Sequence, residues 1–266
     1  MSQLYFLSMG SGSSGNCYYI GTSDFGILID AGVAVSTIKS TLKENGIPLS
    51  NIWGILVTHA HTDHTKSVGI LNVKYHIPIF ATKKTYDGIL RNQNITQKPD
   101  NCYFINKSET FLINEFSILP FHVSHDSSDC SGYTIRYGNK QFTIATDLGE
   151  IGPEATEQIK EAHYLVIESN YDENMLLNGP YPQRLKQRVQ SSSGHLCNST
   201  TARFLADNWN PRFEHIFLCH LSGENNTPDL ALQTTMNTLR DANITPCPIE
   251  PLQRCKPSAL YKFNCQ

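Results

Sequence analysis

The sequence predicts an α/β protein in which two β-sheets pack face to face and helices cover their outer sides. Short strand-like runs crowd the first half of the chain with the spacing of hairpins, and strands alternate with helices in both halves. Residues that can bind metal ions follow directly after several of these strands. Because a rigid sheet positions the loops at its edge, the pattern favours a sandwich with a functional site where strands end.

Hydrophobic periodicity and turn residues indicate the elements in order. Strands are expected over residues 3–9, 16–21, 26–30, 52–58, 116–123, 133–137, 141–146, 164–168 and 215–220. Helices are expected over residues 35–45, 66–75, 182–190, 199–208 and 228–241. The first helix has helical periodicity and is stopped by Gly46 and Pro48. The strand at 52–58 is apolar and rich in β-branched residues, which is typical of a buried strand.

Length and composition favour one domain over residues 1–266. The chain has 266 residues, 39% of them hydrophobic, and no linker divides it. Its formal net charge of −3 argues against a generally basic surface that coats nucleic acid, although a local basic patch remains possible. We find no membrane-spanning run and no signal peptide, so we expect a cytoplasmic protein. The eight cysteines include no C-x-x-C pair, and we expect free thiols.

The Gly/Ser stretch Gly10-Ser-Gly-Ser-Ser-Gly15 is a poor dinucleotide fingerprint. A strand-like run follows it, whereas a pyrophosphate site needs the N-terminus of a helix at that point. We therefore expect no nucleotide cofactor. A doubly wound single sheet also fits the sequence less well than a two-sheet sandwich.

Four residues that can bind metals lie within six positions after the strand at 52–58, namely His59, His61, Asp63 and His64. In an extended loop His59 and His61 can converge on one ion, while Asp63 and His64 turn toward a second. Imidazole and carboxylate ligands suit Zn²⁺, Mn²⁺ or Fe²⁺. A polar loop with surface histidines does not account for this density of ligands. Asp63 is expected to be catalytic as well as a ligand.

Each of the two ions needs further ligands, and later strand ends offer His125, Asp147 and His220. The expected set is His59, His61 and His125 for one ion and Asp63, His64 and His220 for the other, with the Asp147 carboxylate bridging both. A lone Asp at a strand end is more often a turn residue, so Asp147 depends on the whole set. His122 competes with His125, which we favour because His122 alternates onto the other strand face.

With these residues in this order, the chain resembles the metallo-β-lactamase superfamily. The motif H-x-H-x-D-H at 59–64, followed by a later His, Asp and His, is highly specific, and the resemblance covers nearly the whole chain. It implies a four-layer αββα sandwich and a hydroxide that bridges two metals. Members that hydrolyse β-lactams usually carry Cys or Ser at the position of Asp147, whereas a bridging Asp is typical of the phosphodiesterase, nuclease and thioesterase branches.

Further motifs resemble the bacterial YycJ/WalJ-type exonuclease branch, whose members are regarded as DNA exonucleases acting from 5′ ends. These motifs are Gly10-Ser-Gly-Ser-Ser-Gly-Asn16, Ser124-His-Asp126, Glu168-Ser-Asn-Tyr-Asp172, Gly194-His-Leu-Cys-Asn198 and His220-Leu-Ser-Gly-Glu-Asn-Asn226. The chain departs from the branch at Cys197, where Ser is common. The stretch 148–219 is too short for the extra domain that β-CASP nucleases insert there.

A phosphodiester substrate also needs groups near its leaving and non-bridging oxygens. His195 is the expected general acid or phosphate clamp, with a helix-capping or packing role as the alternative. The residues expected to touch substrate are Ser13, Ser14, Asn198, Asn225, Arg184 and Arg188. Arg184 and Arg188 share a helix face, where they either follow a phosphate backbone or form a solvated surface.

Glu168 and Asn170 end another strand, where they either accept a hydrogen bond from a ligand histidine or lie in a solvated loop. The leading hypothesis for function is a hydrolase with two divalent ions that cleaves nucleic acid, with DNA the favoured substrate. The alternatives are a thioester or lactone hydrolase of the glyoxalase-II-like type and a non-catalytic metal-binding regulatory protein. A basic groove with His195 aimed at the metals would favour the nuclease, and a narrow apolar pocket would favour the thioesterase.

Overall fold

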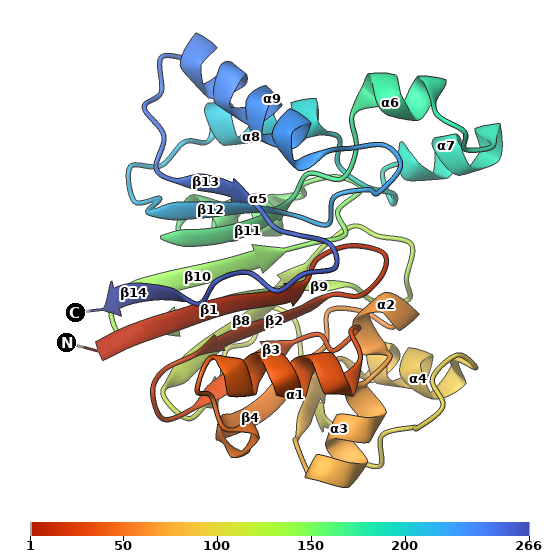
Figure 1. Cartoon of the computed structure of the whole chain (residues 1–266), viewed down its shortest axis with the longest axis vertical. Coiled ribbons are helices and arrows are strands. Elements are labelled where there is room, and N and C mark those ends of the chain that lie inside the picture. Colours follow the sequence, from red (N-terminus) through yellow and green to blue (C-terminus); the bar gives the residue numbers. More distant parts are fainter. Residues whose placement is uncertain (1, 266) are drawn as a thin grey trace.

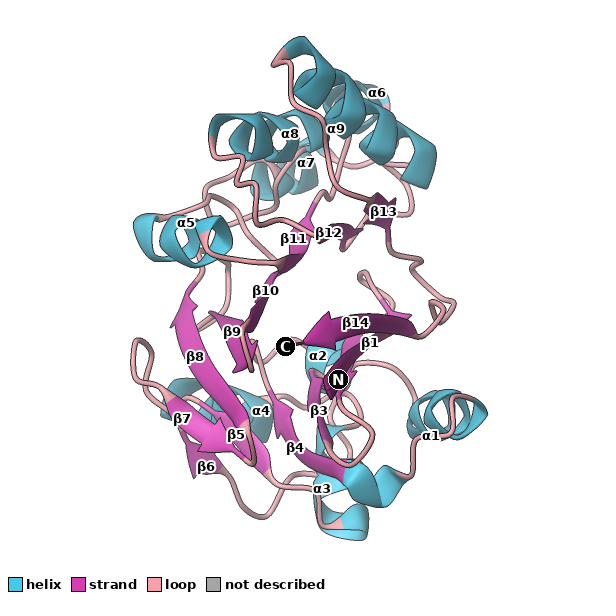
Figure 2. Cartoon of the chain, turned by 90° about the vertical axis from the view of Figure 1, so that its left-hand side faces the viewer, coloured by secondary structure: helices cyan, strands magenta, loops and turns pink. Residues whose placement is uncertain are grey.

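Two mixed sheets of seven strands each form the centre of the structure, a computed structural model that describes residues 2–265. The sheets lie face to face, and helices cover the outer side of each (Figure 1 and Figure 2). The expected αββα sandwich is confirmed. No helix among the described residues is long and apolar enough to cross a lipid bilayer.

The first sheet has the order β14-β1-β2-β3-β4-β5-β6 and the second has the order β13-β12-β11-β10-β9-β8-β7. The first consists of β14 (Tyr261–Cys265), β1 (Ser2–Gly10), β2 (Cys17–Gly21), β3 (Gly26–Ile29), β4 (Ile52–Leu56), β5 (Ile79–Ala81) and β6 (Tyr103–Phe104). The second consists of β13 (Ile249–Pro251), β12 (His215–Cys219), β11 (Tyr164–Glu168), β10 (Lys140–Ala145), β9 (Ser131–Tyr137), β8 (Phe116–His122) and β7 (Phe111–Ile113).

The helices occur in two groups along the chain. The first half contains α1 (Val35–Glu44), η1 (Leu49–Asn51), α2 (Thr62–Thr65), α3 (Val68–Tyr75) and α4 (Lys83–Arg91). The second half contains α5 (Pro153–Lys160), α6 (Glu173–Asn178), α7 (Gln183–Val189), α8 (Asn198–Asp207) and α9 (Pro228–Asp241). Every expected strand and helix is present within one or two residues. The prediction missed α2, α4, α5, α6 and several strands of two to five residues.

Aromatic side chains from both sheets fill the space between them. Phe6 on β1 lies with its ring centroid 4.9 Å from Phe142 on β10 and 4.7 Å from Phe217 on β12. All three side chains are fully buried. Each sheet also packs against its outer helices through an apolar cluster of its own. We therefore expect this core to stabilise the sandwich independently of any bound ion.

Parallel pairing brings the ends of several strands to one edge of the sandwich. β3 runs parallel to β4, and β10, β11 and β12 are parallel to one another. Asp30, Asp147 and His220 directly follow or lie just beyond such strands, and each has a left-handed backbone conformation with φ between 54° and 59°. Asp and His adopt this conformation more readily than most residues. The sheet edge thus gathers side chains from distant parts of the sequence.

Candidate metal centre

The histidine cluster follows β4 and continues into the single turn of α2. His59 Nε2 lies 3.0 Å from His61 Nδ1, and the His125 ring centroid lies 5.1 Å and 5.2 Å from those of His59 and His61. Asp63 and His64 belong to α2, which turns their side chains toward His220 from the second sheet. In each of the two trios that the sequence predicts, the candidate ligand atoms therefore lie within 4.8 Å of one another.

The Asp147 carboxylate lies between the two trios. Its Oδ2 is 3.1 Å from His64 Nε2, while its Oδ1 is 3.4 Å from His220 Nε2 and 3.7 Å from His125 Nε2. His122 instead lies on the surface, with its Nδ1 3.2 Å from Lys107 Nζ. The structure thus brings His125, and not His122, to the cluster.

Three of the five ligand-type imidazoles have an oxygen acceptor on one ring nitrogen. His64 Nδ1 lies 2.7 Å from Asp30 Oδ2, His220 Nδ1 lies 3.0 Å from Glu168 Oε1, and His125 Nδ1 lies 3.0 Å from the Gly194 carbonyl. An acceptor at one ring nitrogen fixes the tautomer and leaves the other nitrogen free to bind a cation. This arrangement is characteristic of metal centres.

Asp30 is a site residue that the sequence analysis missed. It is fully buried, and besides His64 it accepts hydrogen bonds from the backbone N–H and hydroxyl of Thr58, both at 2.8 Å. The same signal that indicated Asp147, an acidic residue at the end of an apolar strand, also marks Asp30. Its role depends on the parallel pairing of β3 with β4, which the sequence pattern did not specify.

Glu168 ends β11 and supports two imidazoles at once. Its Oε1 lies 2.8 Å from His195 Nδ1 and 3.0 Å from His220 Nδ1, while its Oε2 accepts from the backbone N–H of Leu148 and Leu196. Asn170 donates to the His220 carbonyl at 2.7 Å. Glu168 therefore accepts a hydrogen bond from a ligand-type histidine and does not lie in a solvated loop.

The acidic and basic groups of the cluster shift one another's pKa values. Burial disfavours the charge on Asp147, but neighbouring His220 and His64 outweigh burial and hold the pKa of this carboxyl well below its usual range. Burial also disfavours protonation of His220, yet the neighbouring carboxylates of Asp147, Asp63 and Glu168 raise its pKa to about 10. Carboxylates in this cluster therefore stabilise positive charge at its centre.

The residues present fit a divalent metal centre. Nε2 of His220 is buried, lies 3.4 Å from Asp147 Oδ1 and has no hydrogen-bond partner among the described residues, so a cation bound at this nitrogen in place of a proton would satisfy it. Nitrogen and carboxylate oxygen atoms converge there without any thiolate. No cysteine of the described residues forms a disulfide, and none joins the cluster.

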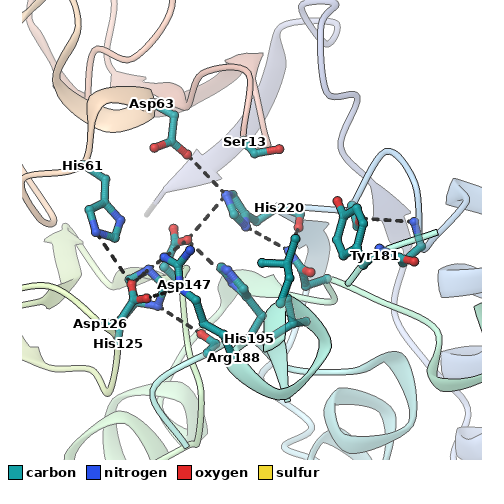
Figure 3. Close-up of a pocket in the computed structure, with 16 residues that line it drawn as sticks. Ser13, His61, Asp63, His125, Asp126, Asp147, Tyr181, Arg188, His195 and His220 are labelled. Carbon is teal, nitrogen blue, oxygen red and sulfur yellow. Dashed lines mark hydrogen bonds and ion pairs between the residues drawn. The ribbon is translucent and has the colours of Figure 1, made fainter. Parts of the chain in front are cut away.

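A cavity of about 260 Å³ opens beside the cluster (Figure 3). Ser13, His195, Asn225 and Arg188 line it, as do the cluster residues His61, Asp63, His125, Asp147 and His220. Asp126 and Tyr181 also line the cavity, and the sequence analysis had not singled out either. His195 therefore lies at the cavity wall with its Nδ1 bonded to Glu168.

Three residues expected to touch substrate lie outside the cavity lining. Asn198 is buried, and its amide bonds Ser169 and Asn226 within the protein. Arg184 is exposed on α7, and Ser14 is exposed on the β1–β2 loop. Asn198 therefore supports Ser169 and Asn226 inside the protein, and its contact with substrate stays a prediction.

The comparisons with known proteins agree with this geometry. A sequence profile described as "Beta-lactamase superfamily domain" matches residues 26–213. The chain belongs to the metallo-β-lactamase superfamily. Within the superfamily it is 34% identical over 239 residues to the exodeoxyribonuclease YycJ of Bacillus anthracis. That alignment covers 90% of each of the two chains. It is 35% identical over 240 residues to the exodeoxyribonuclease WalJ of Streptococcus pneumoniae, covering 89% of this chain and 88% of that protein.

Solved structures with the metallo-β-lactamase fold superpose over almost the whole chain. YhfI from Bacillus subtilis gives a TM-score of 0.73 at 13% identity and covers 99% of this chain and 100% of its own. Zn²⁺-bound PqqB from Methylobacterium extorquens gives a TM-score of 0.71 at 13% identity and covers 96% of this chain and 99% of its own. At such low identity these similarities concern the fold alone.

Proposed function

We propose that this superfamily member is a metal-dependent exodeoxyribonuclease. The observation that carries the proposal is the similarity to YycJ and WalJ, which extends over about nine-tenths of each chain. The cavity beside the centre adds a chemical reason, because it contains groups suited to a phosphodiester.

Two divalent cations fit the ligand-type side chains. His59, His61 and His125 would hold one, Asp63, His64 and His220 would hold the other, and Asp147 would contact both. Such ligands suit Zn²⁺, Mn²⁺ or Fe²⁺. When bound, a pair of cations lowers the pKa of water for attack on phosphorus and neutralises the charge that develops on the phosphate oxygens.

His195 would supply the proton for the leaving oxygen. Its Nδ1 is taken by Glu168, which leaves Nε2 available to the cavity that the ring lines. Burial disfavours protonation of this ring, but Glu168 outweighs that effect and raises the His195 pKa above its ordinary value. A protonated imidazole held in a fixed orientation is an effective general acid near neutral pH.

The lining of the cavity favours a nucleotide as substrate over an acyl group. Most of the side chains around its volume of about 260 Å³ are polar or charged, so it is not the narrow apolar pocket expected of a thioesterase. Tyr181, Leu185 and Val189 give it one apolar wall, on which a sugar or base of any sequence can pack. Because the relatives YycJ and WalJ are named exodeoxyribonucleases, we propose that nucleotides are released successively from an end, with little base preference.

The proposal is tested with the purified protein, supplied with Mn²⁺ or Zn²⁺, on end-labelled single- and double-stranded DNA and on RNA of the same sequence. We expect mononucleotide products from DNA, and a ladder of internal fragments would argue against exonuclease action. The His61→Ala variant, prepared in parallel, controls for contaminating nucleases. Turnover of a thioester or lactone at a rate comparable to DNA would contradict the proposal in favour of the acyl hydrolases.

A further inference from the structure

Arg254 lies in the connection between β13 and β14, which passes beside the β1–β2 loop (Figure 1). Its Nη1 donates to the Leu221 carbonyl at 2.7 Å, and its Nη2 lies 3.4 Å from Ser13 Oγ and 3.3 Å from Ser14 Oγ. Its own carbonyl accepts from the Ser11 N–H at 3.3 Å. Three loops that are remote in sequence therefore fix the position of this guanidinium.

Two glycines make room for the Arg254 side chain. A Cβ on Gly223 would lie 2.9 Å from Arg254 Cζ, and a Cβ on Gly12 would lie 3.3 Å from Arg254 Cγ. Gly12 also has a φ of +151°, which L side chains rarely adopt. The Gly/Ser stretch at 10–15, which is a poor dinucleotide fingerprint, therefore packs closely against an arginine side chain.

The charge of Arg254 has no counter-ion among the residues that the structure describes. Within residues 2–265 no carboxylate lies within ion-pair distance of it, whereas Arg188 on the other side of the cavity pairs with Asp126 at 2.6 Å. Ser13, one of the two serines beside Arg254, lines the cavity, and so does Ser222, next to the Leu221 carbonyl that holds the guanidinium. The unpaired cation therefore lies at the rim of the cavity, next to the side that holds His220.

We infer that Arg254, Ser13 and Ser14 form a second phosphate-binding site, for a phosphate next to the one that is cleaved. The inference rests on the proposed nuclease function and deepens it. A guanidinium offers paired N–H donors to a phosphate, and two hydroxyls beside it add O–H donors. Because these groups lie at the rim, they hold the strand while its scissile phosphate occupies the metal centre.

The bound phosphate has two possible sources, an internal linkage of the strand or a phosphate on its terminus. Comparing KM for oligonucleotides with a 5′-phosphate and with a 5′-hydroxyl shows whether the terminal phosphate is the one bound. In further substrates a neutral methylphosphonate replaces the linkage on one side or the other of the cleaved bond. The substrate whose modification reproduces the effect of removing Arg254 identifies the phosphate that it binds.

The test combines the variant Arg254→Gln with these substrates. We expect R254Q to raise KM for an unmodified DNA oligonucleotide about tenfold, since a charge-assisted hydrogen bond is lost. Neutralising the contacted phosphate should raise KM of the wild-type protein by a similar factor. It should raise KM of R254Q less than about twofold, because that variant already lacks the interaction. In a binding measurement, the slope of log affinity against log salt for single-stranded DNA should become shallower by about 0.7.

Arg240→Gln on α9 removes the charge of an exposed arginine outside the cavity lining and is the control, which should match the wild type. Arg254→Lys keeps the charge and should recover part of the affinity, and thermal melting shows whether the loops still fold. Additive effects of R254Q and the neutral linkage, or an unchanged KM in R254Q, would overturn the second site alone. A wild-type protein that cleaves no DNA would overturn the proposed function together with it.

Discussion

The two sides of the metal centre each rest on one buried carboxylate, but the two carboxylates have different partners. Asp30, from the first sheet, bonds one ligand-type imidazole, His64, and otherwise only Thr58. Glu168, from the second sheet, bonds both His220 and His195. Both carboxylates are fully buried, so neither exchanges its partners for water.

This difference separates two tasks. On the first side, the supporting carboxylate orients a residue that can only hold a metal. On the second side, one carboxylate sets both the position of a ligand-type residue and the orientation and charge of the proposed general acid. A disturbance at Glu168 should therefore affect binding of metal and proton transfer together, whereas a disturbance at Asp30 should affect metal alone.

The largest effect is expected when a ligand itself is removed, on either side. His61→Ala or Asp63→Ala should reduce hydrolysis to background, because each leaves one of the two trios incomplete. Circular dichroism should show a folded protein, since the apolar clusters of the sandwich do not involve these residues. An unfolded variant, or one with undiminished turnover, would contradict this expectation.

The next largest effect is expected from Glu168→Gln. The amide has nearly the same shape, but its NH₂ group must face N–H donors of the backbone or of the two imidazoles, so a buried hydrogen bond is lost. Turnover should fall by about 10²–10⁴-fold, the range expected for His195→Ala if His195 is the general acid. Steady-state kinetics at saturating metal measures it. A fall of the same size in E168Q but not in H195A would remove His195 from the chemistry.

Asp30→Asn should have a smaller effect that metal can reverse. Loss of a carboxylate behind a ligand histidine typically lowers metal affinity or activity about 10–100-fold. We expect Asp30→Asn to show weaker metal binding by titration and near wild-type turnover once metal is saturating, unlike Glu168→Gln. Equal recovery of both variants at high metal would show that the two sides do not differ in the way proposed here.

The same contrast explains how much of the site could be predicted from sequence. His59, His61, Asp63 and His64 are neighbours in the chain, so their spacing alone indicates a metal site. The residues of the second sheet are far apart, and only their shared position after apolar strands linked them. That rule works because β10, β11 and β12 are parallel and end at one edge.

The remaining features depend on contacts that no local pattern encodes. The partnership of Asp30 with His64 depends on which strand lies beside β4, and β14 pairs with β1 from the opposite end of the chain. Strands as short as β5 and β6 are stabilised by their neighbours more than by their own residues. The position of Arg254 could not be predicted from the sequence either, because it is fixed by contacts among three loops that are remote in the chain.

Arg188 and Arg184 give the finest comparison and the smallest expected effect. The sequence places both on one face of α7, but only Arg188 lines the cavity, where it pairs with Asp126 at 2.6 Å. Arg188→Ala should raise KM for DNA about two- to fivefold, the range for a largely exposed ion pair. Arg184→Ala, which removes an equal charge from the same helix, should change KM less.

The reason for the KM increase lies in Asp126 rather than in a direct bond to phosphate. The Asp126 carboxylate lies 3.3 Å from His125 Nε2 and 3.6 Å from His61 Nε2, so without Arg188 an uncompensated negative charge faces the incoming phosphate. The double variant Asp126→Asn/Arg188→Ala removes that charge and should return KM toward the wild-type value. If the double variant is instead as impaired as Arg188→Ala alone, Arg188 contacts the substrate directly. Equal effects of Arg184→Ala and Arg188→Ala would mean that only the net charge of α7 matters.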